Sequence, residues 1–201
     1  MSDRIEDLSR AFERFPGIGP RQAKRFVYHL LSVPIGDRAR LADLITRVAE
    51  DVRQCRDCMR FAPINSVGLC NYCGDPARDD TLLMVVEKDQ DLAAVERANA
   101  YRGRYFVLGG VLTLSGKGMI RERELVTVVE RRLQHGLKEI VLALSATSEG
   151  EHTSDRVREL LGPLRTSVQL SALGRGLATG SELEYSDAET LSGALQNRKE
   201  T

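Results

Sequence analysis

Four cysteines in two close pairs constrain the fold of this chain more than any other feature of its sequence. The pairs have the form Cys-x2-Cys and are separated by eleven residues, and their members are Cys55, Cys58, Cys70 and Cys73. Each pair can place two thiolates on one ion, and two pairs complete the tetrahedral ligand set of a structural zinc site. A redox-active dithiol pair and unpaired core cysteines are the alternatives. We expect a four-cysteine zinc module with a structural Zn²⁺ ion at residues 54–76, where metal binding drives the folding of a stretch with few apolar residues.

A glycine-containing turn near the N-terminus predicts a helix-hairpin-helix. Apolar residues recur at three- and four-residue steps on both sides of Pro16-Gly17-Ile18-Gly19-Pro20, a pattern typical of two short helices joined by a tight turn. Backbone N–H groups at the start of the second helix can face a DNA phosphate, and basic side chains one turn later add charge. The expected DNA-binding residues are Gly17, Gly19, Arg21, Lys24 and Arg25. The alternative is a plain helix-helix turn with a solvated basic face.

A third helix is expected to begin near Asp37, a candidate N-cap, and to bury a stripe of apolar side chains. The members of that stripe are Leu41, Leu44, Ile45, Val48 and Val52. We assign all three helices to one DNA-binding region, residues 1–53.

The charge distribution limits any DNA contact to a local patch. The formal net charge is +0, so no field of the whole protein attracts nucleic acid. Residues 10–25 nevertheless carry five bases and a single acid, Glu13. The sequence shows no signal peptide and no apolar run of the roughly 18 residues that a membrane span needs, so we expect a cytoplasmic protein.

The pattern changes after the cysteines to one of alternating strands and helices. Strands are expected at residues 82–86, 105–108, 140–144 and 168–172, and helices at residues 91–98, 121–135 and 153–161. Such alternation predicts a mostly parallel sheet with helices on its faces, spanning residues 79–172. The last segment, residues 173–201, is expected to form a short strand at 183–185 and a helix that Asp187 caps.

Three acidic residues follow the predicted strands. Glu87 ends the first strand, and Glu149 and Glu151 lie just past the third. Because loops at the carboxyl ends of parallel strands converge on one crevice, these carboxylates are candidates to hold Mg²⁺. The alternatives are ordinary surface acids or a docking surface for a basic partner, and no nucleophile is evident beside them. His152 adjoins the acids, and residues 114–118 are expected to be a mobile loop.

The order of these parts resembles the RecR family of bacterial recombination mediators over essentially the whole chain. The matching motifs are Phe15-Pro16-Gly17-Ile18-Gly19-Pro20, the four cysteines, Val85-Val86-Glu87, Tyr101-Arg102-Gly103-Arg104-Tyr105, Glu149-Gly150-Glu151 and Leu183-Glu184-Tyr185. The resemblance implies a multidomain α/β protein whose residues 79–172 form a Toprim-like domain, with Arg21 and Arg25 at the DNA. The chain departs from the family pattern at Ser145-Ala146, at His152 and at residues 178–181.

The resemblance also implies a function that the residues alone do not give. Family members have no established catalytic activity and usually assemble as a ring-like homotetramer through their N-terminal helices and C-terminal tail. They act with RecO or RecF to help load RecA onto single-stranded DNA coated by SSB. The acids Glu87, Glu149 and Glu151 then serve partner contact rather than catalysis. We therefore predict a non-enzymatic, nucleoid-associated repair scaffold that binds single- and double-stranded DNA with little or no sequence specificity.

Two other functions fit parts of the sequence. A Mg²⁺-dependent Toprim nuclease or primase-like enzyme would use the three acids as metal ligands. A zinc-stabilised interaction module without affinity for DNA would use only the cysteines.

Overall fold

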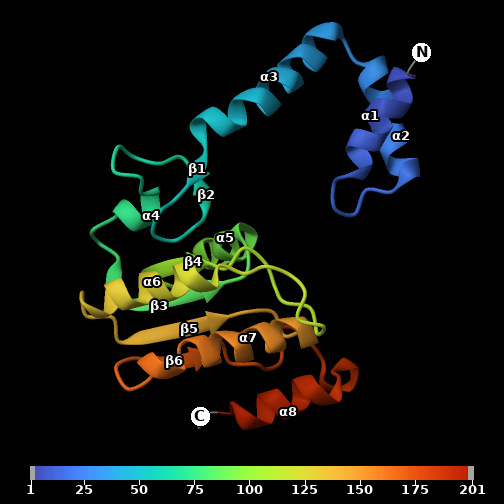
Figure 1. Cartoon of the computed structure of the whole chain (residues 1–201). Helices are drawn as coiled ribbons and strands as arrows, with labels where there is room; N and C mark the ends of the chain where they lie inside the picture. The colour runs from blue at the N-terminus through green and yellow to red at the C-terminus, as the bar shows by residue number, and fades with distance from the viewer. Residues whose placement is uncertain (1–2, 199–201) are drawn as a thin grey trace. The chain divides into compact units, whose positions relative to one another are not determined.

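The structure is a computed structural model that describes residues 3–198, and it divides into two compact units, Met1–Val52 and Arg53–Thr201 (Figure 1). Each unit has its own packing, so the two are described in turn. No helix in the described range is both long and apolar enough to cross a membrane.

The first unit consists of three helices, α1 (Arg4–Glu13), α2 (Pro20–Ser32) and α3 (Ile35–Asp51). The Asp3 side chain caps α1 by accepting a hydrogen bond from the Ile5 amide. Helices α1 and α2 pack through buried Ala23 and Val27 of α2, and an edge-to-face contact joins Phe12 to Phe26 at 5.6 Å. The predicted hairpin of two short helices is therefore present.

Helix α3 differs from the prediction in two ways. It begins at Ile35, two residues before the expected Asp37, and the Pro34 carbonyl accepts the first helical hydrogen bond, from the Arg38 amide at 3.3 Å. None of its residues is buried, so the predicted burial of an apolar stripe is wrong for the described chain. Four members of that stripe are more than 40% exposed: Leu41, Leu44, Ile45 and Val48. The helix is amphipathic as its sequence predicts, but no element within its unit covers the apolar face.

The second unit opens with the cysteine module. It contains a two-stranded antiparallel ribbon of β1 (Arg53–Gln54) and β2 (Phe61–Ala62), followed by the single helical turn α4 (Asn71–Gly74). These elements are too short to be stable alone, which agrees with the expectation that this stretch depends on its cysteines.

A four-stranded parallel sheet forms the body of the second unit. Its strands are β3 (Asp79–Val86), β4 (Gly103–Val107), β5 (Glu139–Ala143) and β6 (Gln169–Ala172), in the order β4-β3-β5-β6. The connecting helices are α5 (Asp89–Ala98), α6 (Glu122–Leu133) and α7 (Ser148–Leu160). The predicted α/β class and the parallel pairing are confirmed. Because the chain leaves β4 and crosses to β5 on the far side of β3, the strand order reverses between β3 and β5.

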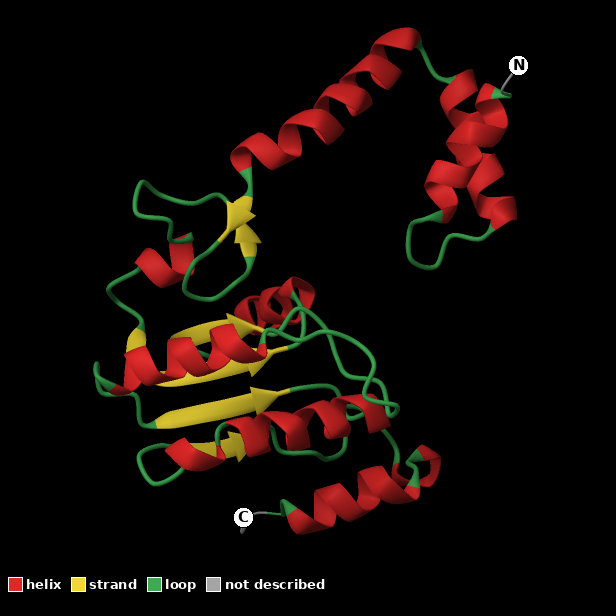
Figure 2. Ribbon diagram, in the orientation of Figure 1, coloured by secondary structure: helices red, strands yellow, loops and turns green. Residues whose placement is uncertain are grey.

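Both faces of the sheet are covered, which explains the continuous apolar run in β3. Leu83 and Val85 point to one face and share a buried cluster with Leu125 of α6. Met84 points to the other face and clusters with Leu92 of α5 and with the four cysteines. Figure 2 shows α6 and α7 on one side of the sheet and α5 on the other. The cysteine module therefore shares a hydrophobic core with the sheet.

The C-terminal segment contains short helices and no strand within its described part. The predicted strand at 183–185 is a 3-10 turn, η2 (Leu183–Tyr185), because no strand edge pairs with it. Another 3-10 turn, η1 (Gly162–Leu164), follows α7. Helix α8 (Ala188–Gln196) is capped by Asp187, whose side chain accepts a hydrogen bond from the Thr190 amide, as predicted.

The packing of α6 on the sheet gives a direct test of the core. Leu125→Ala removes a fully buried side chain and should lower the free energy of unfolding by about 2–5 kcal/mol, because a cavity remains. Leu195→Ala, at a side chain that is 64% exposed, should change it by less than about 0.5 kcal/mol. Urea unfolding followed by circular dichroism measures both, and equal midpoints in the two variants would contradict this packing.

Candidate functional site

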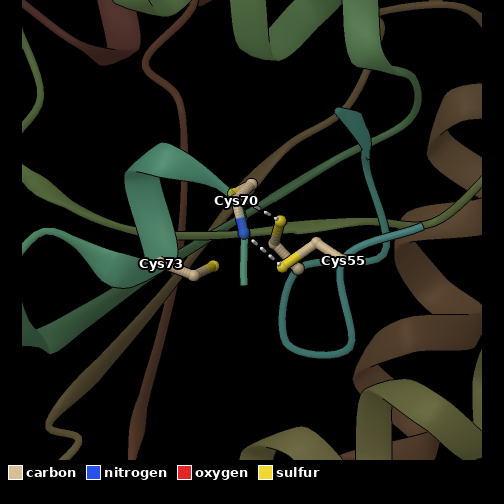
Figure 3. A group of neighbouring side chains, drawn as sticks. Cys55, Cys70 and Cys73 are labelled. Atoms are coloured by element: carbon tan, nitrogen blue, oxygen red, sulfur yellow. Dashed lines mark hydrogen bonds between the residues drawn. The ribbon is translucent and has the colours of Figure 1, made fainter. Parts of the chain in front are cut away.

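The four cysteines converge on one point. Their Sγ atoms all lie within 4.8 Å of one another, and the Sγ atoms of Cys58 and Cys70 are 3.6 Å apart. In Figure 3 the side chains of Cys55, Cys70 and Cys73 point inward from the loop and from the helical turn α4. All four residues are buried. A tetrahedral ion with Zn–S bonds of about 2.3 Å requires sulfur–sulfur distances of about 3.8 Å, so this geometry fits a tetrathiolate metal site.

Tight turns bring each pair together. The carbonyl of Cys55 accepts from the Met59 amide at 2.9 Å, and Met59 takes the left-handed conformation with φ 61° that closes the first turn. Cys70 is the N-cap of α4, and its carbonyl accepts from the Gly74 amide at 2.9 Å. The sulfur of Cys55 accepts from the Cys70 amide at 3.4 Å, which joins the two pairs.

Mutual hydrogen bonds make the four thiols titrate unequally. Bonds from Cys58, then Cys70 and Cys73, hold the pKa of Cys55 far below its usual range. The bond with Cys55 raises the pKa of Cys58, and the same partner raises that of Cys73. The bond with Cys55 opposes ionisation of Cys70, but the bonds with Cys58 and Cys73 outweigh it and lower the pKa of Cys70 to about 6. The cluster therefore favours two thiolates over four, and a bound cation is what can keep all four deprotonated.

Long-range contacts that the sequence did not reveal hold the module on the sheet. The Val107 amide of β4 donates to the Cys58 carbonyl at 2.8 Å, and Phe61 donates its amide to Asp89 of α5 at 3.0 Å. Arg131 and Arg132 of α6 reach the Asp57 carboxylate at 2.7 and 3.5 Å. No local sequence pattern predicts these hydrogen bonds and ion pairs, because the two residues of each are separated by tens of positions in the chain.

A buried ion pair adds to this attachment. Arg78 binds the Glu96 carboxylate at 2.6 Å, and the Tyr105 hydroxyl donates to the same carboxylate at 2.5 Å. Burial would raise the pKa of Glu96, but the bonds from Arg78 and Tyr105 outweigh it and hold that pKa below its usual value. Glu96 is therefore ionised at neutral pH.

The hairpin presents two of its three predicted basic side chains freely. Gly17 has φ 77°, a conformation that favours glycine, and Gly19 is the N-cap that leads into Pro20 at the start of α2. Arg21 and Arg25 are exposed and line a shallow hollow at this helix end, and neither forms an ion pair with the described residues. Lys24 differs, since it forms an ion pair with Glu6 of α1 at 3.8 Å.

Glu87 lies at the carboxyl end of the first strand of the sheet, as predicted, and this end is where the strand order reverses. It follows β3, is 8% exposed, and its Oε1 accepts from the Ser145 amide just past β5 at 2.6 Å. This carboxylate thus ties together the carboxyl ends of two adjacent strands.

Glu149 and Glu151 lie in the first turn of α7, which begins at Ser148 rather than at the predicted 153. Thr147 caps the helix by accepting from the Gly150 amide at 3.1 Å. Glu149 is exposed, while Glu151 forms an ion pair with Arg175 of the C-terminal segment.

The acids do not form a metal-ligand group. Within residues 3–198, the one set of three or more His, Cys, Asp or Glu side chains with ligand atoms within 4.8 Å of each other is the four cysteines. The described structure therefore does not gather Glu87, Glu149 and Glu151 around one ion.

The glycine between the two acids is held tightly. Gly150 is buried, and a Cβ there would overlap the carbonyl oxygen of Ser145.

The segment between β4 and α6 also forms hydrogen bonds. The Thr113 amide donates to the Lys117 carbonyl at 2.8 Å, and the Leu112 amide donates to the Thr153 hydroxyl of α7 at 2.8 Å. Residues 114–118 lie outside helices and strands, as expected of a loop, and contain a hydrogen-bonded turn. His152 lies beside it, in a cavity with Met119 and Arg156.

These features define a class of modular protein that combines a helical hairpin, a four-cysteine metal site and an α/β domain. Acidic residues of that domain lie near the reversal of its strand order. Comparison with known families gives a match to the Toprim domain at residues 81–173, to the RecR helix-hairpin-helix at 5–49 and to the RecR C-terminal region at 176–199. The chain belongs to the RecR family.

Similar proteins support this assignment over almost the full chain. The Recombination protein RecR of Cutibacterium acnes is 38% identical, covering 96% of this chain and 94% of its own length. That of Paracoccus denitrificans is 38% identical, covering 98% and 96%. That of Prochlorococcus marinus is 41% identical, covering 94% and 96%.

The close approach at Gly150 is testable. Gly150→Ala should lower the free energy of unfolding by about 1–3 kcal/mol, because the backbone of Ser145 must move to admit the methyl group. Gly162→Ala is the matched control, since no atom lies within 4 Å of the added Cβ, and it should change stability by less than about 0.5 kcal/mol. Chemical denaturation of both variants is the measurement, and equal stabilities would refute the close contact.

Proposed function

We propose that this chain is a non-enzymatic recombination mediator that acts with RecO- or RecF-type proteins to help load RecA onto SSB-coated single-stranded DNA. The observation that carries the proposal is its 37–41% identity to recombination proteins RecR over nearly its whole length. It would work in the cytoplasm at the nucleoid.

The hairpin is the proposed DNA contact. Gly17 and Gly19 let the backbone approach a phosphate at the start of α2, and Arg21 and Arg25 add exposed positive charge. Lys24 contributes less in this proposal, because Glu6 already pairs with it. Contacts of this kind bind phosphates and read no bases, so the protein binds single- and double-stranded DNA with little sequence preference.

Assembly into a ring-like homotetramer is the second part of the proposal. It is supported by the uncovered apolar face of α3, where Leu44, Ile45 and Val48 are 58–65% exposed. A ring raises DNA affinity, because several hairpins engage one molecule of DNA at high effective concentration.

The acids form the proposed docking surface for a basic partner, rather than a Mg²⁺ site. Glu149 is exposed and available to such a partner, whereas Glu151 is shared with Arg175. Glu87 is buried and contributes indirectly, by accepting a hydrogen bond from the Ser145 amide in the segment that leads to α7. The described structure does not gather these three acids around one point, and Glu151 is already engaged by Arg175.

The four cysteines hold Zn²⁺ in this proposal, as a structural ion without catalytic role. The support is the close approach of their four sulfur atoms, which all lie within 4.8 Å of one another, and the closed set of four protein ligands.

The role of the hairpin is tested by Arg21→Ala combined with Arg25→Ala. DNA binding should weaken on every sequence alike, and the dependence of log affinity on log salt should fall by about 0.9 for each duplex phosphate that the variant no longer neutralises. Arg97→Ala with Arg165→Ala is the matched control, because it removes the same charge from exposed positions in the second unit that form no ion pair with the described residues, and it should leave binding unchanged. Fluorescence anisotropy over a salt series measures this, and full binding by the hairpin variant would disprove the assignment.

Zinc removal tests the metal site. The purified protein should contain one zinc per chain, and a strong chelator should unfold the cysteine module and lower the thermal midpoint of the α/β unit, since structural zinc binding is worth on the order of 10 kcal/mol. Added Zn²⁺ should restore the midpoint, whereas Mg²⁺ should not. Elemental analysis and thermal melting give the result. A zinc-free protein that keeps its midpoint in chelator would show that the site is not a structural zinc centre.

A further inference from the structure

An unusual number of buried arginines surrounds the cysteine module. Arg78, Arg104 and Arg132 are each 7–8% exposed, although arginine is almost never buried without a partner. Arg60 is half-buried and lies over the Tyr72 ring at 4.6 Å. The Nε atoms of Arg60, Arg78 and Arg132 are buried without a hydrogen-bond partner among the described residues. Packing alone does not explain this concentration of positive charge.

The side chain of Arg104 forms a hydrogen bond directly with a metal-ligand residue. It comes from β4, and its Nη1 donates to the carbonyl of Cys73 at 3.1 Å and to the carbonyl of Tyr72 at 2.9 Å. Its Nε donates to the Asp80 carboxylate at 2.7 Å, which fixes the orientation of the guanidinium. One rigid side chain therefore connects the second cysteine pair to the sheet.

Carboxylates offset only part of the local positive charge. Arg78 pairs with Glu96, Arg104 with Asp80, and Arg132 with Asp57 and Asp80. Arg60 has no ion pair among the described residues and lies over the Tyr72 ring. Asp80 is itself 54% exposed, so water screens part of its charge. Four thiolates on one divalent cation carry the opposite excess, a net negative charge buried in the same place. The two excesses are complementary.

We infer that Arg104 is a positioning residue of the metal centre, which holds the Cys70–Cys73 turn closed and stabilises the negative charge of the tetrathiolate. This inference rests on the proposed identity of the ion as zinc. Arg60 and Arg78 add to the positive charge near the site. Both guanidinium groups lie over the ring of Tyr72, which stands between Cys70 and Cys73 in the sequence. Arg104 thereby sets how firmly the metal is retained, without being a ligand.

The test compares variants of the full chain in zinc release to a colorimetric chelator, at fixed pH and salt and well below the thermal midpoint. Arg104→Gln removes the charge and the fork of donors, and zinc should leave about 10- to 100-fold faster, because a charge-assisted bond to a buried group is lost. Arg104→Lys keeps the charge but cannot span both carbonyls, so its release rate should fall between those of the wild type and Arg104→Gln.

Two controls separate this role from general stability. Arg165→Gln removes the same charge from an exposed side chain that has no ion pair among the described residues, and it should leave the release rate within about twofold of the wild type. Val157→Ala removes a buried side chain of α7 from the core on the opposite face of the sheet and should leave the release rate unchanged.

A second readout reports on the ligands themselves. In the Co²⁺-substituted protein, the visible spectrum of the tetrathiolate should change in Arg104→Gln and not in Val157→Ala, because only the former alters the Cys73 turn. Release at the wild-type rate from Arg104→Gln, or from Arg104→Lys should the Gln variant not fold, would overturn the inference. A wild-type protein without zinc would instead overturn the metal assignment in the proposed function.

Discussion

The convergence of four cysteine side chains on one point is the constraint on which the second unit depends. Residues 53–74 contain only two-residue strands and one helical turn, and their buried side chains are mainly the cysteines themselves. The same cysteines are part of the core beneath β3 and α5. The interaction that holds the sulfur atoms together therefore also determines how the module packs on one face of the sheet. The packing of that face in turn depends on the module.

Much of the architecture was predictable, because local patterns encode it. The apolar run in β3, the alternating helices and the Asp187 cap each follow from a short stretch of sequence, and the structure confirms them. The errors arise where burial depends on distant partners. The stripe on α3 is real as a pattern, but the rest of its unit does not cover it. The strand expected at 183–185 has no edge to pair with, and α7 begins early because Thr147 caps it.

The candidate site divides in the same way. The cysteine spacing and the hairpin turn are visible in the sequence because the functional atoms are close in the chain, and their local geometry agrees with the patterns. The contacts of Arg104 with Cys73 and of Arg175 with Glu151 were not predictable, since each joins residues that only the fold brings together. An arginine inside a buried strand was the one available signal, and nothing in its own stretch of sequence points to the cysteines.

The bond from the Val107 amide to the Cys58 carbonyl has a consequence beyond attachment. Strand β4 is at one end of the sheet, and its outward backbone groups are the kind that join a strand from another molecule. The Cys58 carbonyl accepts from one of these groups and the Arg78 guanidinium donates to another, the Gly103 carbonyl at 3.1 Å. The metal module thus shields an exposed sheet edge, which ties the solubility of the folded chain to the integrity of its cysteines.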